Sequence, residues 1–397
     1  MKIRNFANIV KDKCVTTCLN ESTYISTDNM LPHYGGVVPA NIVPSGKATQ
    51  FRQEDILLSN IRPYFRKTWY ASFDGGCSAD VLCIRADKAQ CHPHYLYYQL
   101  ASDNFVKDYL KSCKGAKMPR GDENRLLDYE IALPPIPEQL RIASILGSLD
   151  EKIEINRKKI EKLEALAQMI YEHWFVQFDF PDANGKPYKS SGGAMVWDEE
   201  LKQEIPVGWG VNNLYYIAEY INGCACQKYY AEDGDDALPV VKIKEMHEGF
   251  SSETEYVKSS VPEKYKITAG DILFSWSASL EVMTWTGTDS CLNQHIFHVV
   301  PHNGFSPLYV LQQLQIYIRK FILFANARKT TMGHITADHI EQSRIVVPPN
   351  CLICEFSEKF EALYAEQIIL QKEIQKLMSI RDWLLPMLMN GQVEVSA

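Results

Sequence analysis

The chain carries a long internal repeat, which constrains its fold more than any other feature. Three segments recur in the same order, two of them 214 positions later and one 216 positions later, because of a two-residue insertion. The pairs are residues 55–59 (DILLS) with 271–275 (DILFS), 93–100 (PHYLYYQL) with 307–314 (PLYVLQQL), and 130–135 (EIALPP) with 344–349 (RIVVPP). Solenoid repeats have periods of only about 20–50 residues, so this spacing predicts two copies of a whole domain.

Each copy ends in a Pro-Pro pair that is followed by a long amphipathic stretch. Apolar residues in both stretches recur in steps of four and three, the spacing of a coiled-coil seam. The seam residues are Ile142, Leu146, Leu149, Ile153, Ile160 and Leu163 in the first stretch, and Phe356, Phe360, Leu363, Leu370, Ile374 and Leu377 in the second. Asn156 and Gln367 are polar seam positions, which often fix the register of paired helices. The pattern predicts two long helices that pack on each other.

The globular parts are mixed in character. Short runs such as 81–84 and 295–300 are rich in β-branched and aromatic residues and predict strands, whereas 94–110 and 308–324 have helical spacing. The sequence therefore predicts an α+β protein, with two globular mixed α/β domains separated by two long helices that form an antiparallel coiled coil with pseudo-twofold symmetry. The expected boundaries are 1–135 for the first domain, 136–178 for the first helix, 179–206 for a connector, 207–349 for the second domain and 350–397 for the second helix.

Catalytic motifs are scarce. Neither Pro-Pro pair has the preceding polar and following aromatic residue of an amine methyltransferase, and no P-loop is present. Asp182, Glu200 and Lys202 have the spacing of a metal-dependent nuclease, but their surroundings are too polar for the buried strand that such a site needs. The pairs Cys224/Cys226 and Cys351/Cys354 lack the further ligands of a structural zinc site. We therefore expect no catalytic residue, no metal site and ordinary thiols.

A candidate binding surface recurs at equivalent places in both copies. The net charge of −8 argues against a protein that coats nucleic acid through bulk charge, yet basic and polar residues gather in loops. Arg, Asn and Ser at loop tips can recognise base edges, while Lys mainly holds phosphates. The candidate DNA-contacting residues are Asn60, Arg62, Tyr64, Arg66, Lys67, Lys114, Lys117 and Arg120 in the first copy, and Ser275, Trp276, Ser277, Arg328, Lys329, Thr330 and Thr331 in the second.

Several motifs around the predicted helices carry a family resemblance. They are residues 133–139 (LPPIPEQ), 153–157 (IEINR), 174–181 (WFVQFDFP), 184–193 (NGKPYKSSGG), 204–209 (EIPVGW) and 381–386 (RDWLLP). In these motifs, and in its layout over nearly the whole chain, the protein resembles the specificity subunit of a type I restriction-modification enzyme. One departure is that residues 348–352 lack the Pro-Glu-Gln that follows the first Pro-Pro pair, so we expect the second helix to be capped differently.

The resemblance implies a non-catalytic recognition subunit. Each globular domain would be a target recognition domain for one half of a bipartite site in double-stranded DNA, and the coiled coil would set the spacer. Two modification (methyltransferase) subunits would dock on the long helices, and restriction (translocase and nuclease) subunits would join them. S-adenosylmethionine, ATP and Mg would belong to those partners, and this chain would hold no cofactor. The alternative is a non-enzymatic, two-headed coiled-coil scaffold that binds protein partners.

The sequence favours a cytoplasmic protein that does not contact a membrane. No apolar run approaches the roughly 20 residues that span a bilayer, and the first residues (MKIRNFANIVKDKC) are charged where a signal peptide would be apolar. The 11 cysteines follow no pattern of a small secreted scaffold, so we expect reduced thiols.

Overall fold

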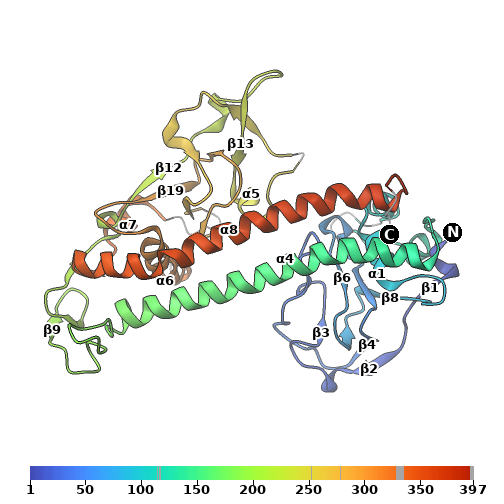
Figure 1. Cartoon of the computed structure of the whole chain (residues 1–397), viewed down its shortest axis with the longest axis horizontal. Helices are drawn as coiled ribbons and strands as arrows, with labels where there is room; N and C mark the ends of the chain where they lie inside the picture. Colours follow the sequence, from blue (N-terminus) through green and yellow to red (C-terminus); the bar gives the residue numbers. More distant parts are fainter. Residues whose placement is uncertain (114, 116–117, 252, 278, 328–334, 394–397) are drawn as a thin grey trace. The chain divides into compact units, whose positions relative to one another are not determined.

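The computed structural model describes residues 1–397 except 114, 116–117, 252, 278, 328–334 and 394–397, and it does not describe the side chains of 248 and 324–327. The chain divides into two compact units, residues 1–154 with 376–397 (unit 1) and residues 155–375 (unit 2). The two longest helices, α4 (Ile136–Tyr171) and α8 (Asn350–Met389), each contribute residues to both units (Figure 1). No helix in the described ranges is long and apolar enough to cross a bilayer.

Unit 1 contains two small sheets. The first has the order β1 (Ala7–Ile9), β8 (Val81–Ala86), β5 (Ile56–Ser59) and β6 (Thr68–Tyr70), with antiparallel neighbours throughout. The second has the order β2 (Lys13–Val15), β4 (Lys47–Phe51), β7 (Gly75–Cys77) and β3 (Tyr24–Ile25), and only its β7–β3 pair is parallel.

Three short helices complete unit 1: α1 (Pro93–Ala101), α2 (Asp103–Leu110) and α3 (Glu123–Asp128). The sequence predicted one helix over 94–110, but the chain breaks at Ser102, whose backbone is extended. The Ser102 hydroxyl accepts a hydrogen bond from the Phe105 amide and so caps the start of α2. A break of this kind keeps the helical spacing on both sides, which is why periodicity alone did not reveal it.

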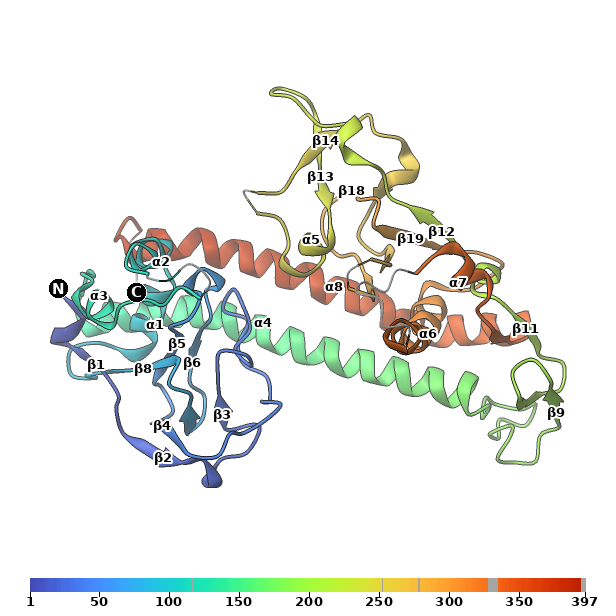
Figure 2. The same cartoon turned by 180° about the vertical axis from the view of Figure 1, so that it is seen from behind.

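Unit 2, which Figure 2 shows from behind, repeats this architecture and adds two antiparallel strand pairs. Its first sheet has the order β12 (Ala218–Asn222), β19 (Ile296–Pro301), β16 (Ile272–Ser275) and β17 (Glu281–Thr284). Its second sheet has the order β14 (Tyr256–Lys258), β13 (Ala237–Val241), β18 (Ser290–Leu292) and β15 (Lys266–Ile267). The remaining elements are β9 (Met195–Asp198) with β10 (Gln203–Pro206), β11 (Gly210–Asn212) with β20 (Ile345–Val347), and the helices α5 (Ile243–Glu248), α6 (Pro307–Ala327) and α7 (Ala337–Glu341).

The topologies confirm the predicted two-copy fold. The first sheets correspond strand for strand, and their registers agree: Ile56 faces Ile84 in unit 1, and Ile272 faces Val299 in unit 2. In each second sheet, one central strand has a parallel neighbour (β3 on β7, β13 on β18) and an antiparallel neighbour (β4 on β7, β15 on β18). Only the fourth strand differs, because β2 extends the sheet beyond β4 whereas β14 extends it beyond β13.

Within each unit, α4 and α8 pack together and run in opposite directions. In unit 1, Ile142 and Leu146 of α4 share a core with Leu385 and Leu388 of α8, and Asp150, further along α4, contacts the earlier Arg381. In unit 2, Asn156 bonds Glu373, and Trp174, in the π-helical turn that follows α4, packs its ring 5.8 Å from that of Phe356. All twelve apolar seam residues named above are buried or partly buried.

The two long helices begin differently. The fully buried Gln139 accepts a hydrogen bond from the His92 amide at 2.8 Å and donates one to the Pro134 carbonyl at 2.7 Å. The equivalent position of α8 is Ile353, which lies in the apolar core of unit 2. A polar anchor in one copy is thus replaced by hydrophobic packing in the other.

Candidate nucleic-acid interface

In unit 1, the fold brings together two segments that are far apart in the sequence. The loop that follows β5 pairs with the segment before α3: the Arg62 amide donates to the Pro119 carbonyl at 2.8 Å, and the Gly121 amide donates to the Asn60 carbonyl at 3.1 Å. Ile61 and Arg120 form an antiparallel bridge between these bonds. We call residues 59–67 and 118–122 the paired loops of unit 1. They join two groups of candidate residues that the sequence could only place separately.

The same pairing occurs in unit 2. The Ile335 amide donates to the carbonyl of Trp276, so the loop after β16 meets the segment before α7. The last residue of the preceding strand supports each loop in the same way. The buried Ser59 hydroxyl donates to the Ile61 carbonyl at 2.9 Å, and the buried Ser275 hydroxyl donates to the Ser277 carbonyl at 3.2 Å. Residues 275–277 and 335–336 are the paired loops of unit 2.

Arg62 and Tyr64 are exposed candidates among the described residues of unit 1, and the Tyr64 ring packs 4.7 Å from that of Phe65. Both side chains are exposed, and the Arg62 guanidinium has no ion pair or hydrogen bond with any residue in the described part of the chain. Arg62 has a φ of 49°, in the left-handed region that non-glycine residues adopt at a cost of about 1–3 kcal/mol. The bonded backbone on either side holds it there. The exposed cationic side chain of Arg62 is therefore carried on a fixed backbone.

The other described candidates of unit 1 have partners within the protein. Arg66 forms an ion pair with Asp103 at 2.5 Å, and Arg120 forms one with Asp80 at 2.6 Å. The Lys67 ammonium donates to the Thr27 carbonyl, and burial lowers its pKa. Asn60 accepts a hydrogen bond from the Tyr109 hydroxyl at 2.7 Å. These four side chains shape and position the loops.

The paired loops of unit 2 carry different side chains. Ser275 and Ser277 are buried, whereas Trp276 is partly exposed and its indole N–H donates to the side chain of Asn222 at 3.1 Å. The rest of the predicted set cannot be placed. Lys114, Lys117, Arg328, Lys329, Thr330 and Thr331 lie outside the described residues.

Sequence reasoning missed the residues that hold the paired loops in place. Asp80, Tyr109 and Asn222 come from other elements, and no motif marks them. The one signal in the sequence was Gly121, a glycine directly after residues 118–120 (MPR), since a glycine often marks a close approach of the backbone to another group. A Cβ atom on Gly121 would lie only 2.2 Å from Cζ of Tyr109, so the loop passes over this ring only because the residue is glycine.

The residues considered for a nuclease do not converge. Asp182 accepts hydrogen bonds from the amides of Asn184 and Lys186 in its own turn. Glu200 forms an ion pair with Arg344, and the Lys202 ammonium pairs with Glu199. The surrounding segment forms the β9–β10 hairpin, in which Trp197 is 54% exposed, so it is not a buried strand.

The two cysteine pairs lie in different environments. Cys351 and Cys354 are exposed on the first turn of α8. Cys224 and Cys226 are buried, and their sulfur atoms lie beside that of a third cysteine, Cys291.

Comparison with known proteins identifies the family. The model of the type I restriction modification DNA specificity domain matches the chain twice, over residues 2–165 and 206–378. The MjaIX specificity subunit of Methanocaldococcus jannaschii is 27% identical over 312 residues, 76% of this chain and 69% of that protein. The HindI specificity subunit of Haemophilus influenzae is 23% identical over 411 residues, 88% of this chain and 89% of that protein.

A solved structure agrees with this assignment at the level of the fold. The type I restriction-modification S subunit from M. genitalium superposes with a TM-score of 0.57 at 15% identity, covering 100% of this chain and 96% of that one. The two family matches correspond to the two copies of the internal repeat and together span well over half of the sequence. The chain therefore belongs to the family of DNA specificity subunits of type I restriction-modification systems.

Proposed function

We propose that each globular domain recognises one half of a bipartite site in double-stranded DNA, and that the paired loops are part of the recognition surface. One observation carries the proposal: the same pairing of two distant loops, supported by the same buried serine hydroxyl, occurs at equivalent positions in both units. A scaffold whose two heads bind unrelated proteins has no reason to keep this construction in both.

The chemistry of Arg62 suits base recognition in the major groove. Arginine can bond both O6 and N7 of guanine with its planar guanidinium, and each such bidentate contact contributes about 1–3 kcal/mol of discrimination. A recognition side chain is most selective when its backbone is fixed, as the bonds of Arg62 and Gly121 to the opposite loop fix it here. The exposed ring of Tyr64, at 46% exposure, offers apolar surface next to it.

The two halves of the site should differ in sequence. Unit 1 presents Arg62 and Tyr64 from its paired loops, whereas unit 2 presents Trp276 on the equivalent loop. The bases that hydrogen-bond a guanidinium are not the ones that suit an indole ring. The two half-sites should therefore differ, and the preferred site is not a palindrome.

The partners follow from the family and from the surface of the helices. We propose that two modification subunits dock on α4 and α8, that restriction subunits join this complex, and that S-adenosylmethionine, ATP and Mg bind to those partners. Large apolar side chains are exposed on these otherwise polar helices, among them Met169 (64%), Ile369 (59%) and Trp383 (60%). Exposed apolar surface of this kind is typical of protein interfaces. An α-helix lengthens by about 1.5 Å per residue, so the length of the paired helices would set the spacer between the half-sites.

Measuring binding to duplex DNA at several salt concentrations, with the modification subunit present, separates this proposal from the scaffold alternative. When binding depends on phosphate contacts, the logarithm of the binding constant falls linearly with the logarithm of the salt concentration. The slope is about −0.9 for each phosphate that the protein neutralises. A matched pair of variants sharpens the test. Arg62→Ala should weaken binding to the target, while Arg52→Ala, an exposed arginine before the opposite end of β5, should not. The scaffold alternative predicts no DNA binding and no salt dependence.

A further inference from the structure

Three buried thiols converge in unit 2. The sulfur atom of Cys224 lies 3.5 Å from that of Cys226 and 3.4 Å from that of Cys291, and all three sulfur atoms lie within 4.8 Å of one another. The residues are 3%, 1% and 0% exposed. Among the residues that the structure describes, this is the only group of three or more potential metal ligands in such proximity.

The backbone is built to bring these thiols together. Cys224 follows β12 and pairs in parallel with Asn293, with its amide donating to the Leu292 carbonyl at 2.9 Å. The preceding residue, Gly223, makes this approach possible, because a Cβ atom there would lie 2.2 Å from the Asn293 carbonyl oxygen. Cys291 stands on β18, 67 positions after Cys224, so a search for short spacings in the sequence could not include it.

The sulfur positions suit a single metal ion. Zinc binds thiolate sulfur at about 2.3 Å, which places two sulfur ligands of a tetrahedral ion about 3.8 Å apart. The two measured separations are a few tenths of an ångström shorter, and the third pair lies within 4.8 Å. An ion in contact with all three sulfur atoms therefore requires only small side-chain shifts.

A buried polar residue lies beside the cluster. Asn293, which is 8% exposed, forms the parallel bridge with Cys224. Its side-chain oxygen accepts a hydrogen bond from the His295 amide at 3.3 Å, which holds the side chain in place. Fixed polar groups around the ligands are a regular part of metal sites.

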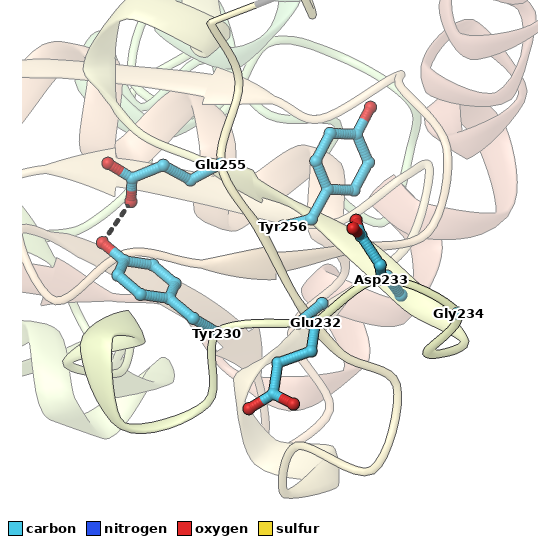
Figure 3. A pocket seen from close by; sticks show the side chains of 8 residues that line it. Tyr230, Glu232, Asp233, Gly234, Glu255 and Tyr256 are labelled. Atoms are coloured by element: carbon cyan, nitrogen blue, oxygen red, sulfur yellow. Dashed lines mark hydrogen bonds between the residues drawn. The ribbon is translucent and has the colours of Figure 1, made fainter.

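An acidic hollow lies in the same unit, beside β13 and β14. Figure 3 shows its lining, where Glu232, Asp233 and Glu255 surround an open space and the Tyr230 hydroxyl donates to Glu255 at 2.6 Å. Negative potential attracts cations, so the hollow raises their concentration around unit 2.

We infer that Cys224, Cys226 and Cys291 form a binding site for a thiophilic metal ion of the zinc class, held by three thiolates. Soft sulfur ligands select such ions over Mg²⁺ and Ca²⁺. The ion would link the segment after β12 to β18 and so brace the second sheet of unit 2. This inference departs from the expectation of ordinary thiols, which considered the pairs Cys224/Cys226 and Cys351/Cys354 but not Cys291. It does not depend on the proposed mode of DNA recognition.

Cadmium titration of the full chain tests the site directly. The protein is stripped of metal with a chelator, kept in a reductant that contains no thiol, and titrated with Cd²⁺ while the ultraviolet absorption of cadmium–thiolate bonds is recorded. We expect saturation at one equivalent per chain. Cys226→Ala and Cys291→Ala should each weaken binding by more than about 100-fold, beyond the 10- to 100-fold effect of losing an outer-sphere partner. Cys91→Ala removes a buried thiol from unit 1 and should change nothing.

A second measurement on the unmodified sequence keeps the test decisive if a variant fails to fold. Alkylation of the native protein, mapped by peptide mass, is compared with and without Zn²⁺. Zinc should slow the modification of Cys224, Cys226 and Cys291 at least tenfold while leaving that of Cys91, which is equally buried, unchanged. Absence of cadmium–thiolate absorption, equal titrations of the wild-type chain and Cys226→Ala, or equal zinc protection of Cys91 and Cys226 would each overturn the inference.

Discussion

The guanidinium of Arg381, in α8, donates to the carboxylate of Asp150, in α4, over 3.0 Å. The Arg381 side chain is only 10% exposed. The second oxygen of Asp150 accepts from the Tyr98 hydroxyl of α1 at 2.6 Å. One buried ionic network therefore joins both long helices to the globular part of unit 1.

Arg381→Met should destabilise unit 1 strongly, because it leaves the Asp150 carboxylate partly buried without its cation. Removing one partner of a buried pair costs about 3–5 kcal/mol, and we expect the low end because Asp150 keeps its bond to Tyr98. Urea unfolding monitored by circular dichroism measures this effect. Lys376→Met, at an exposed position of the same helix, should change the unfolding free energy by less than about 0.5 kcal/mol. Equal effects of the two changes would show that the pair does not hold the helices.

The pH dependence of stability should reflect His94. Its ring stacks on Tyr70 at 4.4 Å and on Tyr98 at 4.9 Å, and burial lowers its pKa from the usual value. The unfolded chain then binds the proton more readily than the folded chain does. The contribution of His94 to stability is complete above about pH 6.5 and is lost as the pH falls toward its lower folded pKa.

Melting temperatures between about pH 7.5 and 5 test this expectation. The decrease on acidification should be smaller in His94→Phe, which keeps an aromatic ring in the stack but cannot bind a proton. His33→Gln changes an exposed histidine of the same unit and should leave the decrease as it is in the wild type. An unaltered pH profile in His94→Phe would assign the acid sensitivity to other groups.

The buried serine hydroxyls should matter for loop geometry. Ser59→Ala and Ser275→Ala each remove a hydrogen bond to a loop carbonyl, worth about 0.5–1.5 kcal/mol of stability. Because the freed loops lose their fixed shape, binding to the target sequence should weaken more than binding to unrelated DNA. Competition titrations with the two kinds of duplex measure the ratio. Ser148→Ala, on the exposed face of α4, is the matched control.

Base and phosphate contacts should respond differently to substitution. Arg62→Ala is expected to relax specificity at one base pair, at a cost of about 1–3 kcal/mol for the target. We propose that Lys111, an exposed lysine just after α2, contacts a phosphate; Lys111→Ala should then weaken binding to all sequences and reduce the salt slope by about 0.9. Binding to a panel of singly substituted duplexes separates the two behaviours. Identical profiles for both variants would contradict this division of roles.

The overall fold was predictable because its signals extend over many residues. The repeat and the two seams each involve many positions, and the two mixed α/β domains and the packed helices α4 and α8 follow the prediction. The second sheet of each unit did not emerge from the sequence. Strands such as β3 and β15, of two residues each, are too short to show an alternating pattern.

The candidate site was predictable in its residue types but not in its partners. Arg62 and Arg66 look alike in the sequence, yet within the described ranges only Arg66 has an ion-pair partner. That partner, Asp103, lies 37 positions away and reaches Arg66 through the fold. Cys291 joins Cys224 and Cys226 for the same reason. Residues far away in the sequence but close in the fold decide which side chains remain available for binding. A single sequence does not indicate which residues become such neighbours.

Exchange of one globular domain tests the central claim most directly. Residues 1–135 are replaced by the corresponding domain of another type I specificity subunit, and methylated sites are mapped across the genome of cells that carry the hybrid with its modification subunit. Recognition of half-sites by separate domains predicts that one half of the methylated sequence changes while the other half stays the same. A methylated sequence that is unchanged, or altered in both halves, would contradict the account.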